Sequence, residues 1–443
     1  MAKRGDGKPM DPVARFHLGN GAEIHEVHVQ ADLSDNGRDQ SRGAMVNYLY
    51  DLSRTEQTHE DFALRGKIAA SLADTGRGTA PLIAETGGIN AMIVDSTALL
   101  EQAVSDVVQS AFQSAGQRCS ACRLVCIQDD IADAFIAMLS GAMQDLRVGD
   151  PGQLATDLGP LIDNTAKQAI AAHIDQMRAA HSVIGETPFH VTSQTPHLAP
   201  VAFELESVAD LQDEVFGPVL HLVRFKGSEL PSLIDQINEL GYGLTMGLHT
   251  RIDHRVEQVS ARAKVGNLYV NRNQIGAVVG QQPFGGEGLS GTGPKAGGPA
   301  YLLRLTQAPR DNQSGTESTP VSPPGPTGET NTLNSVPRGR LLCLGGDTPD
   351  ALAQQEKRVR DTGNIPVRAR GETLETELLR DDIVGVVVEG RLREKVARMW
   401  PKRPGAILPI LSLQDDAERF QLERVVTVDT TAAGGNAALL ASI

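Results

Sequence analysis

Two residues with catalytic potential lie 34 positions apart in the middle of the chain, Glu85 and Cys119. Glu85 follows the apolar run 81–84, which we expect to be a strand, and precedes Thr-Gly-Gly. A carboxylate at a strand end that enters a cleft loses hydration, so its pKa rises towards neutrality, as a general base requires. A strand-end glutamate that faces solvent beside a turn has the same pattern, so this motif alone leaves both interpretations open.

Cys119 lies in Gly-Gln-Arg-Cys-Ser, after the helix-like stretch 101–115. A cysteine near an arginine and a helix end has a lowered thiol pKa and can act as a nucleophile, and nearby backbone N–H groups can stabilise an oxyanion. A buried structural cysteine is the alternative. Cys119-x-x-Cys122 also matches a redox or metal pair, but no second Cys or His pair follows at zinc-ligand spacing. We therefore predict no metal site, and we expect Cys126 in the core.

A third segment with functional potential is Asp-Glu-Val-Phe-Gly-Pro at 213–218. In a functional interpretation, Glu214 hydrogen-bonds a ribose and Phe216 packs against a flat ring. In the alternative interpretation the segment is an ordinary turn. A G-x-G-x-x-G string also occurs within 280–291, but no strand precedes it and no helix follows it. That context argues against a dinucleotide fingerprint.

Composition restricts the classes of partner. The chain of 443 residues carries a net charge of −14, which disfavours nucleic acid or an anionic membrane as the main partner. No apolar run is long enough to span a bilayer, and no apolar region follows the basic start, so no signal peptide is predicted. The chain has 4 cysteines, too few for a disulfide scaffold. We expect a cytoplasmic location.

The chain divides into four segments of different composition. Residues 1–72 hold an apolar island in polar sequence, and residues 73–308 alternate strand-like and helical patterns, which indicates an α/β domain. Residues 309–338 are rich in Pro, Ser and Gly, so we predict a disordered linker. Residues 339–443 resume α/β alternation. Strand-like runs at 340–344, 365–369, 382–388 and 406–411 predict a small Rossmann-like sheet.

Taken together, these motifs resemble the aldehyde dehydrogenase superfamily, and most closely the glutamate-semialdehyde dehydrogenase module of proline utilization A. The resemblance rests on Glu-Thr-Gly-Gly, Gly-Gln-Arg-Cys, Glu-Val-Phe-Gly-Pro and Pro-Phe-Gly-Gly, in that order. It is strongest in 84–96 and 280–299, covers 77–308, and resumes at 338–443 with the closing motif 426–436. The implied fold is a truncated aldehyde dehydrogenase catalytic domain, joined by the linker to the small C-terminal domain.

The resemblance implies a covalent mechanism with NAD as cofactor. Cys119 would attack the aldehyde to give a thiohemiacetal, hydride would pass to NAD, and Glu85 would activate the water that hydrolyses the thioester. Glu214 and Phe216 would hold the nicotinamide ribose and ring. The resemblance also implies four substrate-binding residues. Ser120, Gly276 and Ala277 would bind the α-carboxylate, and Phe284 would pack against the aliphatic chain.

The N-terminal segment departs from that family. The half that supplies most of the NAD site in the family is not recognisable in residues 1–76, and the proline dehydrogenase module is also absent. Residues 10–71 instead resemble the C-terminal end of malonyl-CoA decarboxylase in 11–22, 40–52 and 59–67. His17 matches that family's catalytic histidine, but its serine partner has no counterpart. A junction of two fragments is therefore expected between Ser71 and Ala80.

Three functions follow as hypotheses. The first is NAD-dependent oxidation of L-glutamate γ-semialdehyde to L-glutamate in proline catabolism. The second is an inactive remnant that acts at most as an oligomerisation or scaffold module, and the third is a malonyl-CoA decarboxylase fragment. The missing NAD half predicts that the chain alone forms little NADH. The sequence is also compatible with a homo-oligomer.

Overall fold

The computed structural model describes residues 82–189, 195–305, 321–323, 325–400 and 403–431, together with the backbone of two earlier strands. The chain divides into two compact units, Met1–Ala80 and Pro81–Ile443. In the first unit, β1 (Glu23–His28) pairs antiparallel with β2 (Met45–Leu49). His17 lies outside the described residues, as does the first part of the predicted linker.

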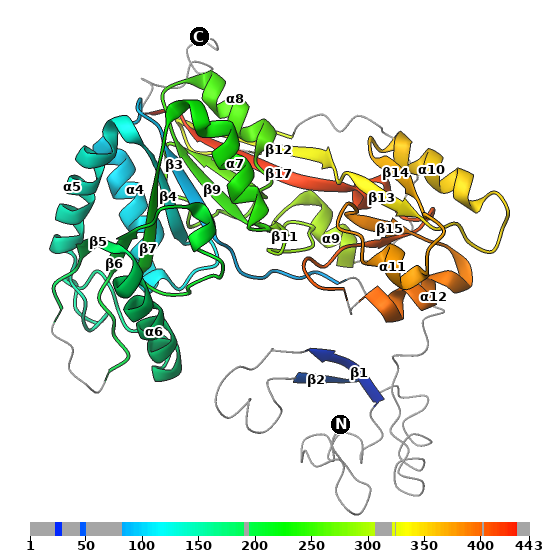
Figure 1. Cartoon of the computed structure of the whole chain (residues 1–443), viewed down its shortest axis with the longest axis horizontal. Helices are drawn as coiled ribbons and strands as arrows, with labels where there is room; N and C mark the ends of the chain where they lie inside the picture. The colour runs from blue at the N-terminus through cyan, green and yellow to red at the C-terminus, as the bar shows by residue number, and fades with distance from the viewer. Residues whose placement is uncertain are drawn as a thin grey trace, which may run out of the picture. The chain divides into compact units, whose positions relative to one another are not determined.

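A 9-stranded sheet forms the centre of the second unit, in the order β12-β17-β10-β9-β3-β4-β7-β6-β5 (Figure 1). All neighbours from β17 to β6 are parallel, and the edge strands β12 and β5 are antiparallel to theirs. The strands are β3 (Asn90–Val94), β4 (Cys122–Gln128), β5 (Ser182–Glu186), β6 (Val201–Glu204), β7 (Val219–Phe225), β9 (Thr245–His249), β10 (Asn267–Val270), β12 (Glu329–Pro337) and β17 (Gln421–Asp429). The short strands β8 (Tyr242–Gly243) and β11 (Glu287–Gly288) pair separately.

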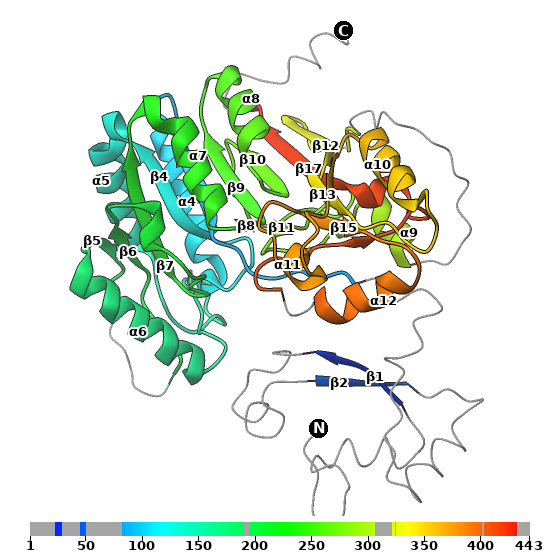
Figure 2. The ribbon, with the colours of Figure 1, turned by 45° about the vertical axis from the view of Figure 1, so that its right-hand side comes forward.

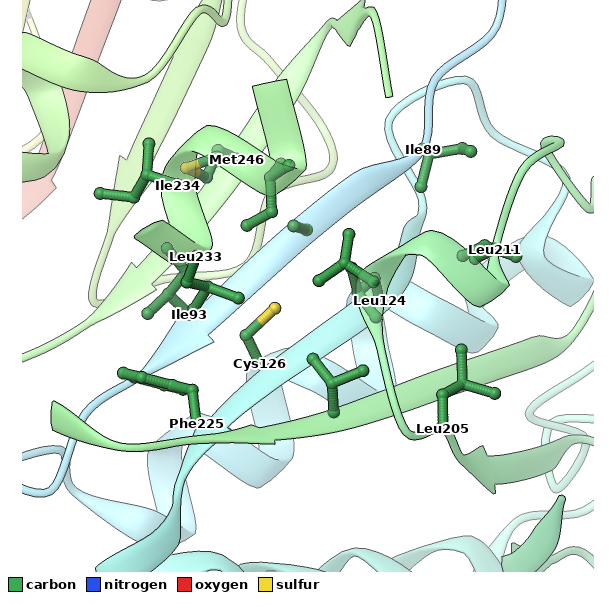
Figure 3. Packing of buried hydrophobic residues seen from close by; sticks show 14 of the residues in the cluster. Ile89, Ile93, Leu124, Cys126, Leu205, Leu211, Phe225, Leu233, Ile234 and Met246 are labelled. Atoms are coloured by element: carbon green, nitrogen blue, oxygen red, sulfur yellow. The ribbon is translucent and has the colours of Figure 1, made fainter. Parts of the chain in front are cut away.

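Helices cover both faces of this sheet (Figures 1 and 2). One core forms where α4 (Leu100–Phe112) and α5 (Asp129–Asp145) pack on one face. The other face packs against α6 (Asn164–Ala180), α7 (Leu230–Glu239) and α8 (Asp253–Arg262). Figure 3 shows Cys126 among the side chains of this second core, as the sequence predicts. Helices on both faces of a largely parallel sheet confirm the α/β class.

The sequence around β4 shows how the sheet is specified. Every residue of this strand is buried, because β3 and β7 flank it in the sheet and helices cover both faces. The one charged residue in it is Arg123. Before β4, helix α4 ends where Ser114 and Ala115 take φ of 58° and 53°, a left-handed conformation that cannot continue the helix.

A second sheet lies in the C-terminal part of the chain. Its 4 strands are all parallel, in the order β14-β13-β15-β16. They are β13 (Arg340–Cys343), β14 (Ile365–Arg368), β15 (Gly385–Val387) and β16 (Ile410–Leu411), one within each strand-like run of the sequence. The helices of this region are α10 (Ala351–Asp361), α11 (Leu374–Leu378) and α12 (Gly390–Met399), and α9 (Pro299–Leu305) precedes it.

The structure corrects the predicted linker and the domain boundary. Residues 329–337, expected as part of the linker, form β12, which pairs along its whole length with β17. Strand β17, expected in the small domain, adds to β10 at the edge of the large sheet. Backbone pairing over nine residue pairs supplies the order that the polar composition of this segment did not predict. No helix in the described ranges is long and apolar enough to cross a membrane.

Candidate active site

The candidate catalytic residues meet at one edge of the large sheet. Glu85 precedes β3, Cys119 precedes β4 and Glu214 precedes β7. These three strands are parallel neighbours, so their amino ends lie side by side. The sequence predicted that Glu85 follows the end of a strand, whereas in the structure it precedes the start of β3.

Glu85 does not follow a strand, so that part of the prediction was wrong. Residues 82–84 belong to no strand, and Leu82 is 50% exposed. The segment is held by Thr292, whose Oγ1 accepts from the Ala84 N–H at 2.9 Å, and by a bridge between Glu85 and Gly291. The Glu85 side chain is exposed on one side, yet partial burial raises its pKa, opposed by the charge of Lys295. This direction suits a general base.

Cys119 is exposed, whereas Cys122, Cys126 and Cys343 are buried. The structure therefore excludes the interpretation of Cys119 as a buried structural cysteine. Its pKa is raised rather than lowered, because partial burial is the largest effect and the Glu214 and Glu85 carboxylates add to it. The backbone N–H groups of Ser120 and Cys119 act in the opposite direction. The expected low pKa was wrong, because the sequence does not show how close the carboxylates lie.

Asn90 fixes the cysteine loop to the sheet. Its Nδ2 donates to the carbonyl of Cys119 at 2.7 Å and to that of Ala121 at 2.9 Å. Its Oδ1 accepts from the Thr245 N–H at 3.1 Å. Asn90 is 1% exposed and begins β3, so the loop is tied to two strands through one side chain.

Glu214 packs against the glycines that follow Glu85. A Cβ at Gly87 would lie 2.0 Å from Glu214 Oε2, so the carboxylate occupies space that only glycine leaves free. Glu214 Oε1 lies 3.3 Å from Arg123 Nη2, and the Arg123 guanidinium lies 5.2 Å from the centre of the Phe216 ring. Burial raises the pKa of Glu214, while Arg123 and the Gly88 N–H lower it. The segment 213–218 is therefore built into the site.

A pocket of about 730 Å³ opens beside this segment. That volume lies within the range of small-molecule sites, about 300–1,000 Å³. Its wall is mostly apolar, with the Glu214 carboxylate and the half-exposed Phe216 ring at one side. The lining residues are Ser114, Gln117, Pro160, Ile162, Ala166, Ala169, Ile170, His173, Glu214, Val215 and Phe216.

The candidate α-carboxylate residues lie on two segments that Gln274 connects. The buried Gln274 donates to the Ser120 carbonyl at 3.4 Å, and it directly precedes the loop that holds Gly276 and Ala277. Gly276 takes φ of 73°, and no atom lies within 4 Å of the position of an added Cβ. The backbone here is open and accessible, as contact with a carboxylate requires.

Phe284 is held by a network beneath its loop. Asn267 Nδ2 donates to the Pro283 carbonyl at 2.9 Å. The buried Lys295 donates to the Gly285 carbonyl at 2.5 Å and to Asn267 Oδ1 at 2.8 Å, and burial lowers its pKa to about 7. A bridge between Phe284 and Ala296 closes the loop. Phe284 itself is partly buried.

Sequence reasoning missed two residues of the site, Asn90 and Arg123. Arg123 had a visible signal, since a charged residue stands in the otherwise apolar run 121–127. Asn90 directly follows the glycine motif, but nothing in the sequence shows where its amide points. Among the described residues, no group of three or more His, Cys, Asp or Glu side chains is arranged to hold a metal ion.

Two families match the chain. The aldehyde dehydrogenase family matches residues 65–309, more than half of the chain. The malonyl-CoA decarboxylase C-terminal domain matches residues 1–81. These ranges bear out both resemblances seen in the sequence and overlap around the expected junction.

Individual relatives agree with this assignment. Bifunctional protein PutA of Salmonella typhimurium is 42% identical over 467 residues, which cover 87% of this chain and 35% of that protein. A 1-pyrroline-5-carboxylate dehydrogenase of Geobacillus kaustophilus is 37% identical, covering 51% of this chain and 44% of that protein. A crystal structure of mutant PutA from Bradyrhizobium japonicum matches with a TM-score of 0.51 and 53% identity, over 53% of this chain and 24% of that one. The chain thus spans about a third of the PutA protein, and it belongs to the aldehyde dehydrogenase family.

Proposed function

We propose that this chain oxidises L-glutamate γ-semialdehyde to L-glutamate with NAD, a step of proline catabolism. The observation that carries the proposal is the convergence of Glu85, Cys119 and Glu214 at the amino ends of three neighbouring strands. The names of the relatives, PutA and 1-pyrroline-5-carboxylate dehydrogenase, support the choice of substrate.

Cys119 acts as the nucleophile. Its thiolate adds to the aldehyde carbon and forms a thiohemiacetal, whose oxygen lies within reach of the N–H groups around the thiol. Bound NAD would supply the two-electron acceptor that converts the thiohemiacetal into a thioester. Glu85 then takes a proton from water, the water oxygen attacks the resulting thioester, and the carbon–sulfur bond breaks to release glutamate and the thiolate. The raised pKa of Glu85 makes it the stronger base for this step.

The pocket beside Glu214 fits the nicotinamide riboside half of NAD. Phe216 offers a flat apolar surface to the ring, and the Glu214 carboxylate accepts hydrogen bonds as a ribose hydroxyl requires. The described lining contains no lysine or arginine to meet the pyrophosphate. We therefore expect weak NAD binding and a high KM for NAD.

The substrate end is assigned to the loops that carry Ser120, Gly276, Ala277 and Phe284. The N–H groups at Gly276 and Ala277, with the Ser120 hydroxyl, are suited to the α-carboxylate of the semialdehyde. Phe284 packs against the aliphatic chain. The network of Asn267 and Lys295 holds the Phe284 loop in place before substrate arrives.

The second candidate is a non-catalytic remnant of a dehydrogenase. It is favoured by the same pocket, which lacks a cation for the pyrophosphate, and by Glu214, which is already paired with Arg123. In this case the thiol and the carboxylates persist without turnover.

NADH formation separates the two candidates. The purified chain is given the semialdehyde and NAD up to millimolar concentration, and NADH is followed by its absorbance. The dehydrogenase proposal expects slow turnover that is lost in Cys119→Ala and kept in Cys122→Ala, since Cys122 is buried away from solvent. No NADH above the Cys119→Ala background at any NAD concentration would establish the remnant.

A further inference from the structure

Arg123 is a buried cation at the centre of the candidate site. Its side chain is wholly buried in β4. Nη1 donates to the carbonyl of Gly116 at 2.7 Å and of Gly217 at 3.3 Å. Nη2 donates to the carbonyl of Arg118 at 3.0 Å and to Glu214 Oε1 at 3.3 Å. The planar guanidinium thus serves four acceptors, which a lysine ammonium at one point cannot reproduce.

These acceptors belong to two separate loops. Gly116 and Arg118 lie just before Cys119, and Glu214 and Gly217 flank Phe216. A Cβ at Gly116 would lie 2.2 Å from the Gly217 carbonyl oxygen, so the two loops are in direct contact. A buried charge is expensive, and Arg123 Nε is buried without a hydrogen-bond partner, so an apolar residue would suit a strand core better. The placement of Arg123 therefore serves the loops rather than the strand.

Two histidines support the backbone of Arg123. The Nδ1–H of His221 donates to the Arg123 carbonyl at 2.9 Å, and His221 Nε2 accepts from His173 Nε2 at 3.0 Å. Burial lowers the pKa of both rings, so both are neutral near pH 7 and this tautomer is fixed. His173 lines the pocket beside Glu214. The chain of contacts runs from the pocket wall to the arginine.

We propose that Arg123 is a positioning residue that sets both the spacing and the charge balance between the Cys119 thiol and the Glu214 carboxylate. Because the Arg123 side chain is wholly buried, it has no exposed surface for substrate or cofactor. This proposal rests on the proposed function only because it takes Cys119 as the reactive thiol. Without the charge of Arg123, Glu214 would stand unpaired beside Cys119 and disfavour the thiolate.

The test is the pH dependence of Cys119 alkylation by iodoacetamide in the full chain. Because the other cysteines are buried, the fast phase reports Cys119. We expect Arg123→Met to shift the midpoint upward by about one pH unit, and the double variant Arg123→Met/Glu214→Gln to return it towards the parent value. The matched control is Arg224→Met on the adjacent strand β7, whose guanidinium pairs with Asp133 and Glu204. It should leave the midpoint unchanged.

A merely structural role for Arg123 would lower thermal stability without a shift that Glu214→Gln reverses. An unshifted midpoint in Arg123→Met, or a shift that the double variant keeps, overturns the proposal. If Arg123→Met does not fold by circular dichroism, Glu214→Gln alone decides. This variant removes the carboxylate that raises the pKa of the thiol and leaves the Arg123 charge unpaired, so the midpoint should fall. An unchanged midpoint contradicts the proposal. Neither NAD nor aldehyde is present, so failed turnover leaves this test intact.

Discussion

The side-chain amide of Asn90 donates to the backbone carbonyl of Cys119 at 2.7 Å. Through this bond and its partner at Ala121, the loop that presents the thiol is attached to the first residue of β3. Cys119 is exposed, while its backbone is held by the hydrogen bonds from Asn90. A reactive group on a rigid support is the arrangement that covalent catalysis needs.

Asn90→Ala should therefore increase the mobility of Cys119, the proposed nucleophile, and lower the stability of the fold. The substitution leaves the Cys119 and Ala121 carbonyls and the Thr245 N–H without their partner. We expect a loss of about 1–3 kcal/mol in the free energy of unfolding, and slower alkylation of Cys119 at fixed pH. Urea unfolding and iodoacetamide kinetics measure the two effects.

Asn331→Ala is the matched control for that variant. Asn331 is also buried and hydrogen-bonded, to Glu329 and Thr427, but it lies in the edge strand β12. It should cost a similar amount of stability and leave the alkylation rate unchanged. Equal slowing in both variants would show that Asn90 acts only through global stability.

Gly87→Ala should displace the Glu214 carboxylate. The new Cβ would lie 2.0 Å from Glu214 Oε2, so the side chain must move, and its contact with Arg123 is lost. We expect weaker NAD binding, measured as an increase of about tenfold in the KM for NAD or by calorimetry; tenfold corresponds to about 1.4 kcal/mol.

Gly141→Ala provides the comparison for Gly87→Ala. Gly141 lies in α5 with no atom within 4 Å of an added Cβ. Alanine there should stabilise the helix by about 0.5–1 kcal/mol and leave NAD binding unaltered. Unaltered binding in Gly87→Ala as well would mean that Glu214 does not contact the cofactor.

His221 should make the fold acid-sensitive. Burial lowers its pKa to about 3, so the folded chain keeps this ring neutral. The stability that this provides is present above the ordinary histidine pKa and is lost as the pH falls towards the folded value. Between about pH 7.5 and pH 5 the expected loss is about 2 kcal/mol in the free energy of unfolding. The hydrogen bond to the Arg123 carbonyl opposes this shift in pKa, whereas the electrostatic effects of His173, Arg123 and His181 add to it.

His221→Asn removes the titration but can keep the donor to the Arg123 carbonyl. Between those two pH values the free energy of unfolding of this variant should fall less than that of the parent chain. The difference should be most of the about 2 kcal/mol that the titration of His221 contributes. His254→Gln replaces a histidine at an exposed position and should follow the parent chain. A parent-like acid profile in His221→Asn would refute this assignment.

The sequence was sufficient for the α/β class, because the class depends on local patterns. Local patterns also singled out the candidate catalytic segments, whose role stays a proposal. The apolar run around β4 predicts a buried strand, and the glycines after Glu85 predict a close approach, which Glu214 makes. The strand-like runs of the C-terminal part were likewise found at their predicted positions.

Long-range pairing was not predictable. Strand β12 forms from a polar segment because β17, almost a hundred residues later, supplies its hydrogen-bonding partner. The pKa of Cys119 depends on Glu85 and Glu214, which come close only after β3, β4 and β7 align. The lowered pKa inferred from a neighbouring arginine was therefore wrong, because partial burial of the thiol is the largest effect and these two carboxylates add to it.

The most direct measurement is a search for acylated Cys119 in the Glu85→Gln variant. Incubated with NAD and L-glutamate γ-semialdehyde and then quenched in acid, this variant should retain the thioester, because the base that activates water is missing. Mass spectrometry should find one glutamyl group on the peptide that carries Cys119, and none in a Glu85→Gln/Cys119→Ala chain. If Cys119 stays unmodified in Glu85→Gln while NADH is formed, Cys119 is not the nucleophile and the account is wrong.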